Sequence, residues 1–584
     1  MKTMKKTIYI WGLVAASFLC SCSEDILDIE PFGVVGEDVL ANKDGVDKLL
    51  IGCYSTLDGM ASDDYYVWNN FWATDDARMG SNAGVNAFDA FLINPTYSEI
   101  ATRWKTLYGF VNRCNSVLIL LNRVEDMSES EKNVAAAQAR FIRAYTYFFL
   151  AVIWKNVPWI DETIDYGKRN FFVSNTEVDI YAKIEEDLRF AAENLPETWN
   201  EVGRINCWAA RCMLAKTYMF QKKFSEAKAI LDDVIANGKT TRGLKYRLLD
   251  RYRDNFRTAT KNGSEAVFEV QMSVNDGTSN GINGNPMSFM NGTYGGNANN
   301  GFGWFQPTFD LVDAFQTDAE TGLPLLDNYF ETPVTTDYGL ASTTDFTPYE
   351  GTLDPRLDWC VGRRGIPYLD WGNHPGKSWV RNQSNGGPYS SMKHTAERAS
   401  VLTDRQGTNK TNVPYDAIRF ADVLLWAAEC EVEVGSLEKA EEYVNMVRTR
   451  ASNPDGFVRK YENGAFVDSY AANYKVGLYT GQFAANGVSY ARKAVRFERR
   501  LELAMEHHRY FDLLRYDGND FDLEAWIDAF LKREGNRLTE SPNNAYLQGN
   551  FVRGKHELYP IPQVEIDRSI RPDGTPALIQ NPGY

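Results

Sequence analysis

Three stretches of the sequence combine flat aromatic rings with carboxylate, amide and guanidinium groups. An aromatic ring offers a large apolar face, and Arg next to it offers planar hydrogen-bond donors. This chemistry suits a sugar ring, which has apolar C–H faces and a polar rim. Residues 63–82, 273–305 and 368–389 therefore form a candidate ligand-binding surface. Its candidate ligand-contacting residues are Tyr65, Tyr66, Trp68, Trp72, Asp75, Arg78, Asn82, Tyr294, Trp304, Trp371 and Trp379.

Core packing is the alternative role for each of these rings, because a mixed run of aromatic residues must turn some rings inward. We leave this alternative open for Trp72 and for Phe305, which follows Trp304 directly. Trp68, Tyr294 and Trp304 stand among Asn, Gly and Asp residues, and this setting favours exposure of their rings.

Catalysis has weaker support in the sequence. Glu498, Glu502 and Glu506 repeat at a spacing of four and would form one stripe on a helix. A glycoside hydrolase needs two carboxylates roughly 5–9 Å apart. However, Arg499 and Arg500 lie within one turn of them, and such neighbours usually form helix-stabilising ion pairs.

Other catalytic and metal-binding patterns are missing from the sequence. His507 and His508 are adjacent, so on a helix they would diverge by about 100°, which is poor geometry for joint metal ligation. The sequence contains neither HExxH nor GxxxxGK[ST], and its five histidines suggest no Ser/His/Asp grouping. We therefore predict no catalytic residue, no metal and no cofactor, and leave open whether Ca²⁺ braces the loops.

The first residues have the pattern of an exported lipoprotein. Lysines precede the apolar run 8–19, which is too short to span a bilayer comfortably. Leu19 and Ser21 stand three residues and one residue before Cys22, as in the bacterial lipobox. We predict that residues 1–21 are a signal peptide and that Cys22 carries acyl chains that anchor the protein to a membrane.

Charge and cysteine usage narrow the class further. The net charge of −16 argues against a general nucleic-acid binder, because neutralising phosphates needs clustered Lys and Arg. Six cysteines after Cys22 are scattered over nearly 400 residues without C-x-x-C spacing. This pattern indicates buried thiols rather than a disulfide framework or a zinc site, although one disulfide remains possible.

Helical periodicity covers much of the chain and predicts the scaffold behind the loops. The helical blocks are residues 38–60, 97–153, 177–237, 416–450 and 488–516. The second block is expected to stop at Asn156-Val157-Pro158, because proline ends a helix. Two of them share a spacing of small residues that resembles a tetratricopeptide helix pair. The first copy is Ala215, Tyr218, Ala227, Leu231 and Val234, and the second is Ala428, Glu431, Ala440, Val444 and Val447.

The remaining segments have a loop composition. Residues 273–305 are dense in Gly and Asn, and residues 333–413 are rich in Pro, Gly, Thr and Asn with aromatic residues between them. Their aromatic content favours ordered, functional loops over disorder. The proline-rich segment 560–584 is predicted to dock on the helices as an extended strap.

A series of motifs runs in order along nearly the whole chain. It comprises DILDIEP (25–31), ARFIRAYTYFFLAVIWKNVPWI (139–160), AARCMLAKTYMFQKKFSEAKAILDDVI (209–235), EAVFEVQ (265–271), DPRLDW (354–359), IRFADVLLWAAECEVEVG (418–435), FERRLELAMEHHRYFDLLRY (497–516) and LYPIPQVEIDRSIRPDGTPALIQNPGY (558–584). Together these motifs resemble the SusD/RagB family of outer-membrane nutrient-binding lipoproteins of Bacteroidetes.

The resemblance implies an all-α, SusD-like fold, in which a tetratricopeptide-like helical scaffold of four units packs against a long loop-rich ligand-binding half. It also implies an outer-membrane lipoprotein that binds oligosaccharide without cleaving it. Its partner would be a SusC-like TonB-dependent transporter, on which the lipoprotein acts as a lid. The acidic residues after Cys22 are consistent with display on the outer face of the cell.

The expected organisation is a signal peptide (1–21), an N-terminal helical region with a tetratricopeptide-like unit (22–240), and a C-terminal region (241–584). The last region would hold the binding loops, a second helical repeat block and the strap. We expect a surface lipoprotein that binds oligosaccharide or polysaccharide and delivers it to the transporter. The alternatives are a tetratricopeptide-like scaffold that binds a protein or peptide, and a glycoside hydrolase.

Overall fold

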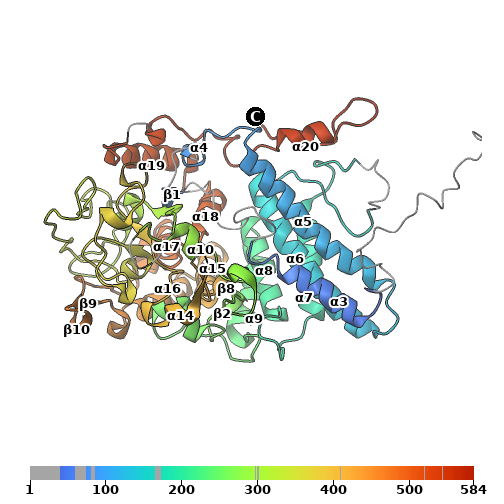
Figure 1. Cartoon of the computed structure of the whole chain (residues 1–584), viewed down its shortest axis with the longest axis horizontal. Helices are drawn as coiled ribbons and strands as arrows, with labels where there is room; N and C mark the ends of the chain where they lie inside the picture. The colour runs from blue at the N-terminus through green and yellow to red at the C-terminus, as the bar shows by residue number, and fades with distance from the viewer. Residues whose placement is uncertain are drawn as a thin grey trace, which may run out of the picture.

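The computed structural model describes residues 40–59, 74–80, 86–164, 172–295, 298, 301–407, 409–518, 520–541 and 544–584. Stacked helices form one half of the molecule, and loops with short helices and strands form the other (Figure 1). The predicted fold class, a mostly helical tetratricopeptide-like scaffold with a loop-rich half, is confirmed. Among the described helices, none is both long enough and apolar enough to cross a membrane.

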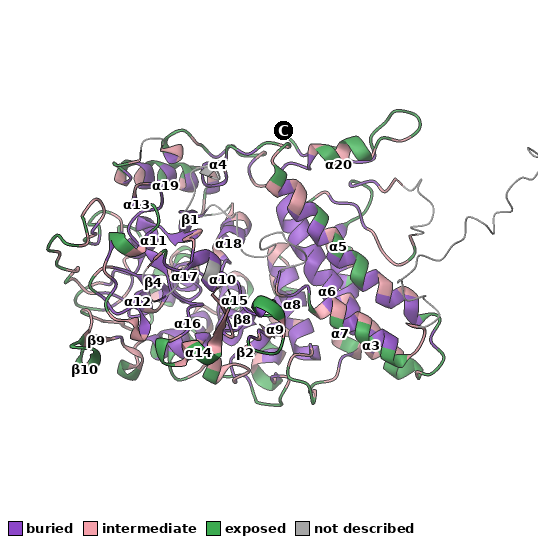
Figure 2. Cartoon of the chain, viewed as in Figure 1, coloured by how far each residue is buried: buried purple, intermediate pink, exposed green. Residues whose placement is uncertain are grey.

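The scaffold begins with three helices: α3 (Lys43–Tyr54), α5 (Ser98–Leu121) and α6 (Glu129–Trp154). A capping box starts α6, where Ser128 and Glu131 satisfy each other's backbone N–H groups. Its end at Trp154, ahead of Pro158, confirms the predicted stop. Residues 141–154 are all buried, because α6 packs between α5 and α7 (Ile180–Asn194) (Figure 2).

The two tetratricopeptide-like segments are neighbours in space although they are far apart in sequence. The first forms α8 (Cys207–Phe220) and α9 (Phe224–Asn237), and the second forms α15 (Phe420–Val434) and α16 (Leu437–Ala451). Helix α9 packs against α15, so the two pairs stack directly. The alanines of the shared spacing are completely buried, which lets the helices approach closely: Ala215, Ala227, Ala428 and Ala440.

The predicted helical block 488–516 contains two helices. Helix α17 (Gln482–Glu502) ends before Glu506, and α18 (Arg509–Tyr516) starts after a turn in which Met505 and His507 have positive φ. The predicted stripe of three glutamates on one helix is therefore wrong. A further helix, α19 (Leu523–Arg537), was not predicted, although Asp522 caps it and its buried residues follow helical spacing.

The described strands form five two-stranded antiparallel pairs. They are β1 (Ala77–Met79) with β3 (Phe305–Pro307), β2 (Ala266–Val270) with β8 (Tyr415–Arg419), β4 (Val361–Gly362) with β5 (Ser390–Ser391), β6 (Arg405–Gln406) with β7 (Lys410–Thr411), and β9 (Arg459–Glu462) with β10 (Ala465–Tyr470). The short helices are α4 (Asn86–Asp89), α10 (Met287–Asn291), α11 (Phe309–Ala314), α12 (Leu357–Cys360), α13 (Gln383–Gly386), α14 (Val401–Asp404) and α20 (Gln563–Arg568).

The C-terminal segment is a docked strap, as predicted. The Trp154 indole donates a hydrogen bond to the Pro560 carbonyl (2.9 Å). The Asn581 side chain donates back to the carbonyls of Trp154 (2.9 Å) and Tyr559 (2.8 Å). The bond from Asn581 satisfies a carbonyl at the end of α6 that has no partner within the helix, and together the bonds hold the strap against α6.

The cysteines of the described residues are free thiols buried in the core: Cys53, Cys114, Cys207, Cys212, Cys360 and Cys430. Burial raises the pKa of several of them, which keeps these thiols protonated.

Helix α17 lies at the centre of a buried ion-pair network. Glu498 pairs with Arg356 and Arg448, both at 2.7 Å, and Glu502 pairs with Arg356 at 2.9 Å. Arg419 and Arg450 also contact Glu502. The predicted role of these glutamates in ion pairs is confirmed, but their partners come from distant segments and not from the same helix turn.

The charges in this network are fully removed from solvent. Burial alone would raise the pKa of Glu502, but Arg450, Arg419 and Arg356 outweigh burial and hold that pKa well below its usual value. The adjacent Arg499 and Arg500 turn to other partners, namely Asp422 and Asp512 for the first and Asp76 and Asp310 for the second.

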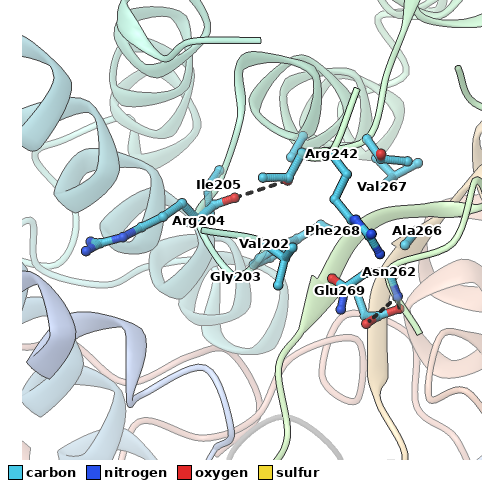
Figure 3. A pocket seen from close by; sticks show the side chains of 13 residues that line it. Val202, Gly203, Arg204, Ile205, Arg242, Asn262, Ala266, Val267, Phe268 and Glu269 are labelled. Atoms are coloured by element: carbon cyan, nitrogen blue, oxygen red, sulfur yellow. Dashed lines mark hydrogen bonds between the residues drawn. The ribbon is translucent and has the colours of Figure 1, made fainter. Parts of the chain in front are cut away.

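Two acids face each other between β2 and β8, of which Asp416 is buried and Glu269 is half-buried. Glu269 stands directly opposite Asp416 in the antiparallel register. Burial raises the pKa of Glu269 to about 7, and the pKa of Asp416 is raised by burial and by Glu269. Figure 3 shows Glu269 hydrogen-bonded to Asn262 beside a cavity of about 20 Å³, which is too small to admit a sugar ring.

Removing one carboxylate from the α17 network should strongly destabilise the fold. We expect Glu502→Gln to lower the free energy of unfolding by about 3–5 kcal/mol, because three arginines lose their buried counter-charge. The control is Glu442→Gln, whose side chain is 59% exposed and pairs with Lys439, and which should cost less than about 1 kcal/mol. Urea unfolding measures both, and equal losses would contradict a structural role for the network.

Glu269 should make stability depend on pH in a defined direction. Its pKa is higher in the folded protein than the usual 4.5, so the folded state favours the protonated form. The free energy of unfolding should therefore fall as pH rises from about 4.5 to about 7. Glu269→Gln removes this loss and should be more stable than the natural protein at pH 8, by roughly 1–2 kcal/mol.

At pH 4.5 the difference between Glu269→Gln and the natural protein should vanish. Thermal or urea unfolding across the pH range measures it, with the exposed Glu442→Gln as the control. A difference that stays constant with pH would show that Glu269 does not titrate in this way.

Candidate functional site

The first two predicted loops are joined at their roots. In the β1–β3 pair, Arg78 is opposite Gln306 and Met79 is opposite Phe305. One residue further, the Gly80 backbone N–H donates a hydrogen bond to the Trp304 carbonyl (3.3 Å). The ladder therefore brings the described roots of these two loops together.

The third predicted loop is hydrogen-bonded to both of these loop roots. The Tyr294 backbone N–H donates to the Trp379 carbonyl (2.8 Å). The Asn385 side chain donates to the Gly80 carbonyl (3.0 Å), and the Gln306 side chain donates to the Gly387 carbonyl (2.8 Å). Segments that are separated by up to about three hundred residues thus converge through direct hydrogen bonds.

Two glycines allow this close approach. A Cβ atom added to Gly80 would overlap the side chain of Gln306. A Cβ added to Gly386 would overlap Gln306 Oε1 and would lie 2.8 Å from the Gly80 Cα atom. Because real Cβ atoms do not approach other atoms so closely, both positions require glycine for the loops to pack as they do.

Four side chains of the second and third loops form what we call the aromatic platform: Tyr294, Phe302, Trp379 and Arg381. Tyr294 is 45% exposed. The Arg381 guanidinium lies over the rings of Tyr294 and Phe302, 5.2 and 5.3 Å from their centroids. Trp379 is half-buried and meets the Tyr368 ring edge to face at 5.8 Å.

Phe302 and Arg381 were not in the predicted set of ligand-contacting residues, although they lie in the predicted segments. The available signal was the position of Arg381, two residues after Trp379 in a loop rich in Asn and Gly. Its contact with Tyr294 joins two loops about 87 residues apart, which composition alone does not reveal.

Trp371 lies in the same small cluster that supports Trp379. Both tryptophans pack against a satellite core that contains Tyr368, Leu369 and Met392. The Trp371 indole N–H donates to the Ala396 carbonyl (3.0 Å). Arg405 lies 5.7 Å from its ring centroid, so the Trp371 ring is held in place and is half-buried.

Trp304 lies at the boundary of the core, and Phe305 lies inside it. Trp304 is half-buried and packs against the main core, so its predicted exposure is only partial. Phe305 is buried, and its ring lies 4.1 Å from the His507 ring, as the core-packing alternative required.

Asp75 and Arg78 lie in the interior, where neither side chain faces solvent. The Asp75 carboxylate accepts two hydrogen bonds from Arg509 (2.8 and 2.7 Å) and one from the Trp526 indole (2.9 Å). Arg78 pairs with Glu534. Both residues therefore serve the packing of the loop root, and we remove them from the predicted ligand-contacting set.

Burial alone would raise the pKa of Asp75, but Arg500 and Arg509 outweigh burial and lower it. Asp75 thus stays ionised inside the protein and ties β1 to α17 and α18. The other predicted residues lie outside the described residues, so their placement stays a prediction: Cys22, Tyr65, Tyr66, Trp68, Trp72 and Asn82.

The carboxylates considered for hydrolysis do not form an accessible pair. Glu498, Glu502 and Glu506 are buried and held by arginines or, for Glu506, also by Lys393. Within the described part of the chain, no group of three or more His, Cys, Asp or Glu side chains could hold a metal ion.

The chain has similar relatives among curated proteins and solved structures. A SusD-like protein P25 of Formosa agariphila is 22% identical over 550 residues, which cover 88% of this chain and 90% of the relative. A SusD homolog from Bacteroides thetaiotaomicron superposes with a TM-score of 0.66 at 21% identity, over 94% of this chain and 98% of that one.

A third similar protein was solved with a ligand. It is the surface glycan-binding protein A of Bacteroides thetaiotaomicron, in complex with laminarihexaose. Its TM-score is 0.60 at 19% identity, and the match covers 92% of this chain and 99% of that one.

Family comparisons cover both halves of the chain. Residues 28–219 match a family described as starch-binding associating with outer membrane. Residues 264–584, more than half of the chain, match the SusD family. The order of motifs, the helical scaffold and these matches agree, and the chain belongs to the SusD family.

Proposed function

We propose that this protein captures an oligosaccharide on the aromatic platform. The observation that carries this proposal is the convergence of separate loops around Tyr294, Trp379 and Arg381. Glycan binding is a general property of the family to which the chain belongs. The laminarihexaose complex of a similar structure supports the same ligand class.

The platform has the chemistry that a sugar ring needs. Tyr294 presents an exposed ring that can stack on apolar C–H groups, and burying such a face excludes water. Arg381 is held over Tyr294 and Phe302, so its planar N–H donors are already oriented for ring hydroxyls.

We propose that binding serves uptake through the outer membrane. The lipobox before Cys22 supports a lipid anchor, and the acidic residues that follow support display on the outer face. The ligand would pass to a SusC-like TonB-dependent transporter. The family description of residues 28–219 names the outer membrane and supports this location.

We propose binding without cleavage. The only regularly spaced acidic residues that suggested hydrolysis are buried in the α17 network. Incubation of the purified protein with the bound oligosaccharide should release no reducing ends. Release at a steady rate would instead establish the hydrolase alternative.

A peptide-binding scaffold is the second candidate, and the structure favours it less. Helices α6 and α15 are buried along most of their length by the rest of the chain (Figure 2). The helix faces that a tetratricopeptide scaffold would offer to a peptide are therefore largely filled here.

Removing rings from the aromatic platform should weaken oligosaccharide binding. We expect Tyr294→Ala and Trp379→Ala each to raise the dissociation constant at least tenfold, or about 1.4 kcal/mol, because a stacking face is lost. Calorimetry against a panel of neutral oligosaccharides that starts with laminarihexaose measures the effect. Ile570→Ala, which removes an exposed apolar side chain from the strap, should bind normally.

A panel with no binding to the natural protein would refute the saccharide proposal. Normal binding by both platform variants would move the site elsewhere on the surface.

Gly386→Ala should separate the third loop from β1. The added methyl group meets the Gly80 backbone, so we expect a loss of roughly 1–3 kcal/mol in stability and weaker oligosaccharide binding. Gly109→Ala in α5 is the matched control, because nothing lies within 4 Å of its added Cβ and Ala favours a helix. Chemical denaturation and calorimetry measure the two effects. Unchanged binding by Gly386→Ala would show that the platform does not depend on this packing.

A further inference from the structure

A second concave site lies apart from the aromatic platform, between the 3₁₀ helix Tyr252–Phe256 and the β9–β10 hairpin. It is a pocket of about 330 Å³, which we call the arginine pocket. Its apolar walls are Trp359, Pro367, Leu369, Phe457, Val458 and Phe466. The β9–β10 hairpin is exposed on both faces (Figure 2). Phe466 at its edge is 50% exposed.

Arg253 lines this pocket and is only 5% exposed. Its Nη1 and Nη2 atoms donate to the carbonyls of Lys393 (3.2 Å) and Thr395 (3.4 Å). Its Nε–H has no hydrogen-bond acceptor among the described residues. Within those residues, no carboxylate lies within ion-pair distance of Arg253, and burial lowers its pKa to about 10.

This arrangement sets Arg253 apart from the arginines of the α17 network. Arg356 and Arg419, equally buried, each contact two or more carboxylates. A buried guanidinium with only carbonyl partners keeps a large desolvation cost. An anion in the pocket, beside the guanidinium, would offset that cost.

The acidic groups of the pocket are largely engaged already. Asp254 pairs with Arg251 at 2.9 Å, and Glu397 pairs with Arg257 at 3.0 Å. Asp370 accepts the backbone N–H groups of two residues that follow Glu397 (2.6 and 2.8 Å). Asp455 is exposed at the rim, and Arg459, also in the lining, pairs with Asp468 on the hairpin. None of these carboxylates turns to Arg253.

We propose that the arginine pocket binds an acidic sugar unit, with its carboxylate or sulfate group directed to Arg253 and its ring against Trp359 and Phe466. This inference rests on the proposed saccharide function for the choice of ligand class. The volume suits a single ring, the aromatic walls supply its stacking faces, and the guanidinium selects the charge. The pocket thereby adds selectivity for charged units that the aromatic platform does not supply.

The test uses Tyr294→Ala, in which platform binding is expected to be at least tenfold weaker, as the background. Calorimetry compares a uronic-acid disaccharide, a sulfated disaccharide and a neutral disaccharide of the same size. We expect an acidic ligand to bind at least tenfold more tightly than the neutral one, and the two acidic arms identify which anion the pocket prefers.

Two variants in that background locate the site. Arg253→Lys keeps a charge but loses the planar guanidinium. Phe466→Ala removes a half-exposed ring without disturbing the core. Each variant should weaken acidic-sugar binding at least fivefold. Arg247→Ala is the control, because its side chain is 64% exposed and lies outside the pocket. Circular dichroism and unfolding curves test whether Arg253→Lys is folded. If Arg253→Lys is unfolded, Phe466→Ala alone decides the outcome.

Equal binding of acidic and neutral ligands, or unchanged binding by Phe466→Ala, would overturn the proposal. So would a ligand-soaked crystal structure in which the anionic group lies away from the Arg253 guanidinium. These outcomes are separate from failure of the platform, which is read from neutral oligosaccharides and the natural protein.

Discussion

The fold depends on the burial of opposite charges around helix α17. Glu498 and Glu502 are removed from water, and each is stabilised only because arginines from other segments reach it. Such a network gains little over an apolar core, but it is severely destabilised when one member is missing. The network therefore constrains how the segments that supply its arginines pack against α17. The segment of Arg356 in the loop-rich half and the segment of Arg448 in the helical half must both meet α17 in one register.

The same helix connects this constraint to the binding surface. Arg500 lies two residues before Glu502 on α17. It pairs with Asp76 and Asp310, which flank the β1–β3 ladder. The ladder in turn holds the roots of the first two loops, and Gln306 holds the third. Loops of this length lose much entropy when they are ordered. Fixing the roots by buried ion pairs means that the fold, and not the ligand, bears the entropic cost of ordering them.

Sequence reasoning reached the helices more reliably than the site. Periodicity and the stop at Pro158 gave the bounds of α6 closely, and the spacing around Ala215 and Ala428 indicated helices that prove to stack. Composition found the loops that converge, but it placed Asp75 and Arg78 at the ligand although both are buried. A carboxylate beside aromatic residues reads the same whether its partner is a sugar hydroxyl or a distant arginine. The partner depends on tertiary contacts between segments hundreds of residues apart, and the local sequence pattern does not predict such contacts.

Arginine illustrates why burial and partner must be considered together. Arg356 is buried with three carboxylates and is a structural residue. Arg381 lies over the exposed ring of Tyr294, where its donors remain near solvent and near any ligand. Arg253 is buried as Arg356 is, but its hydrogen-bond acceptors are only backbone carbonyls and no carboxylate pairs with it among the described residues. The desolvation cost of a guanidinium is similar in the two buried cases, so the difference lies in what offsets it. In Arg356 the fold supplies the anion, whereas at Arg253 the fold supplies a cavity beside the donor, and that is the arrangement expected when the anion comes from outside.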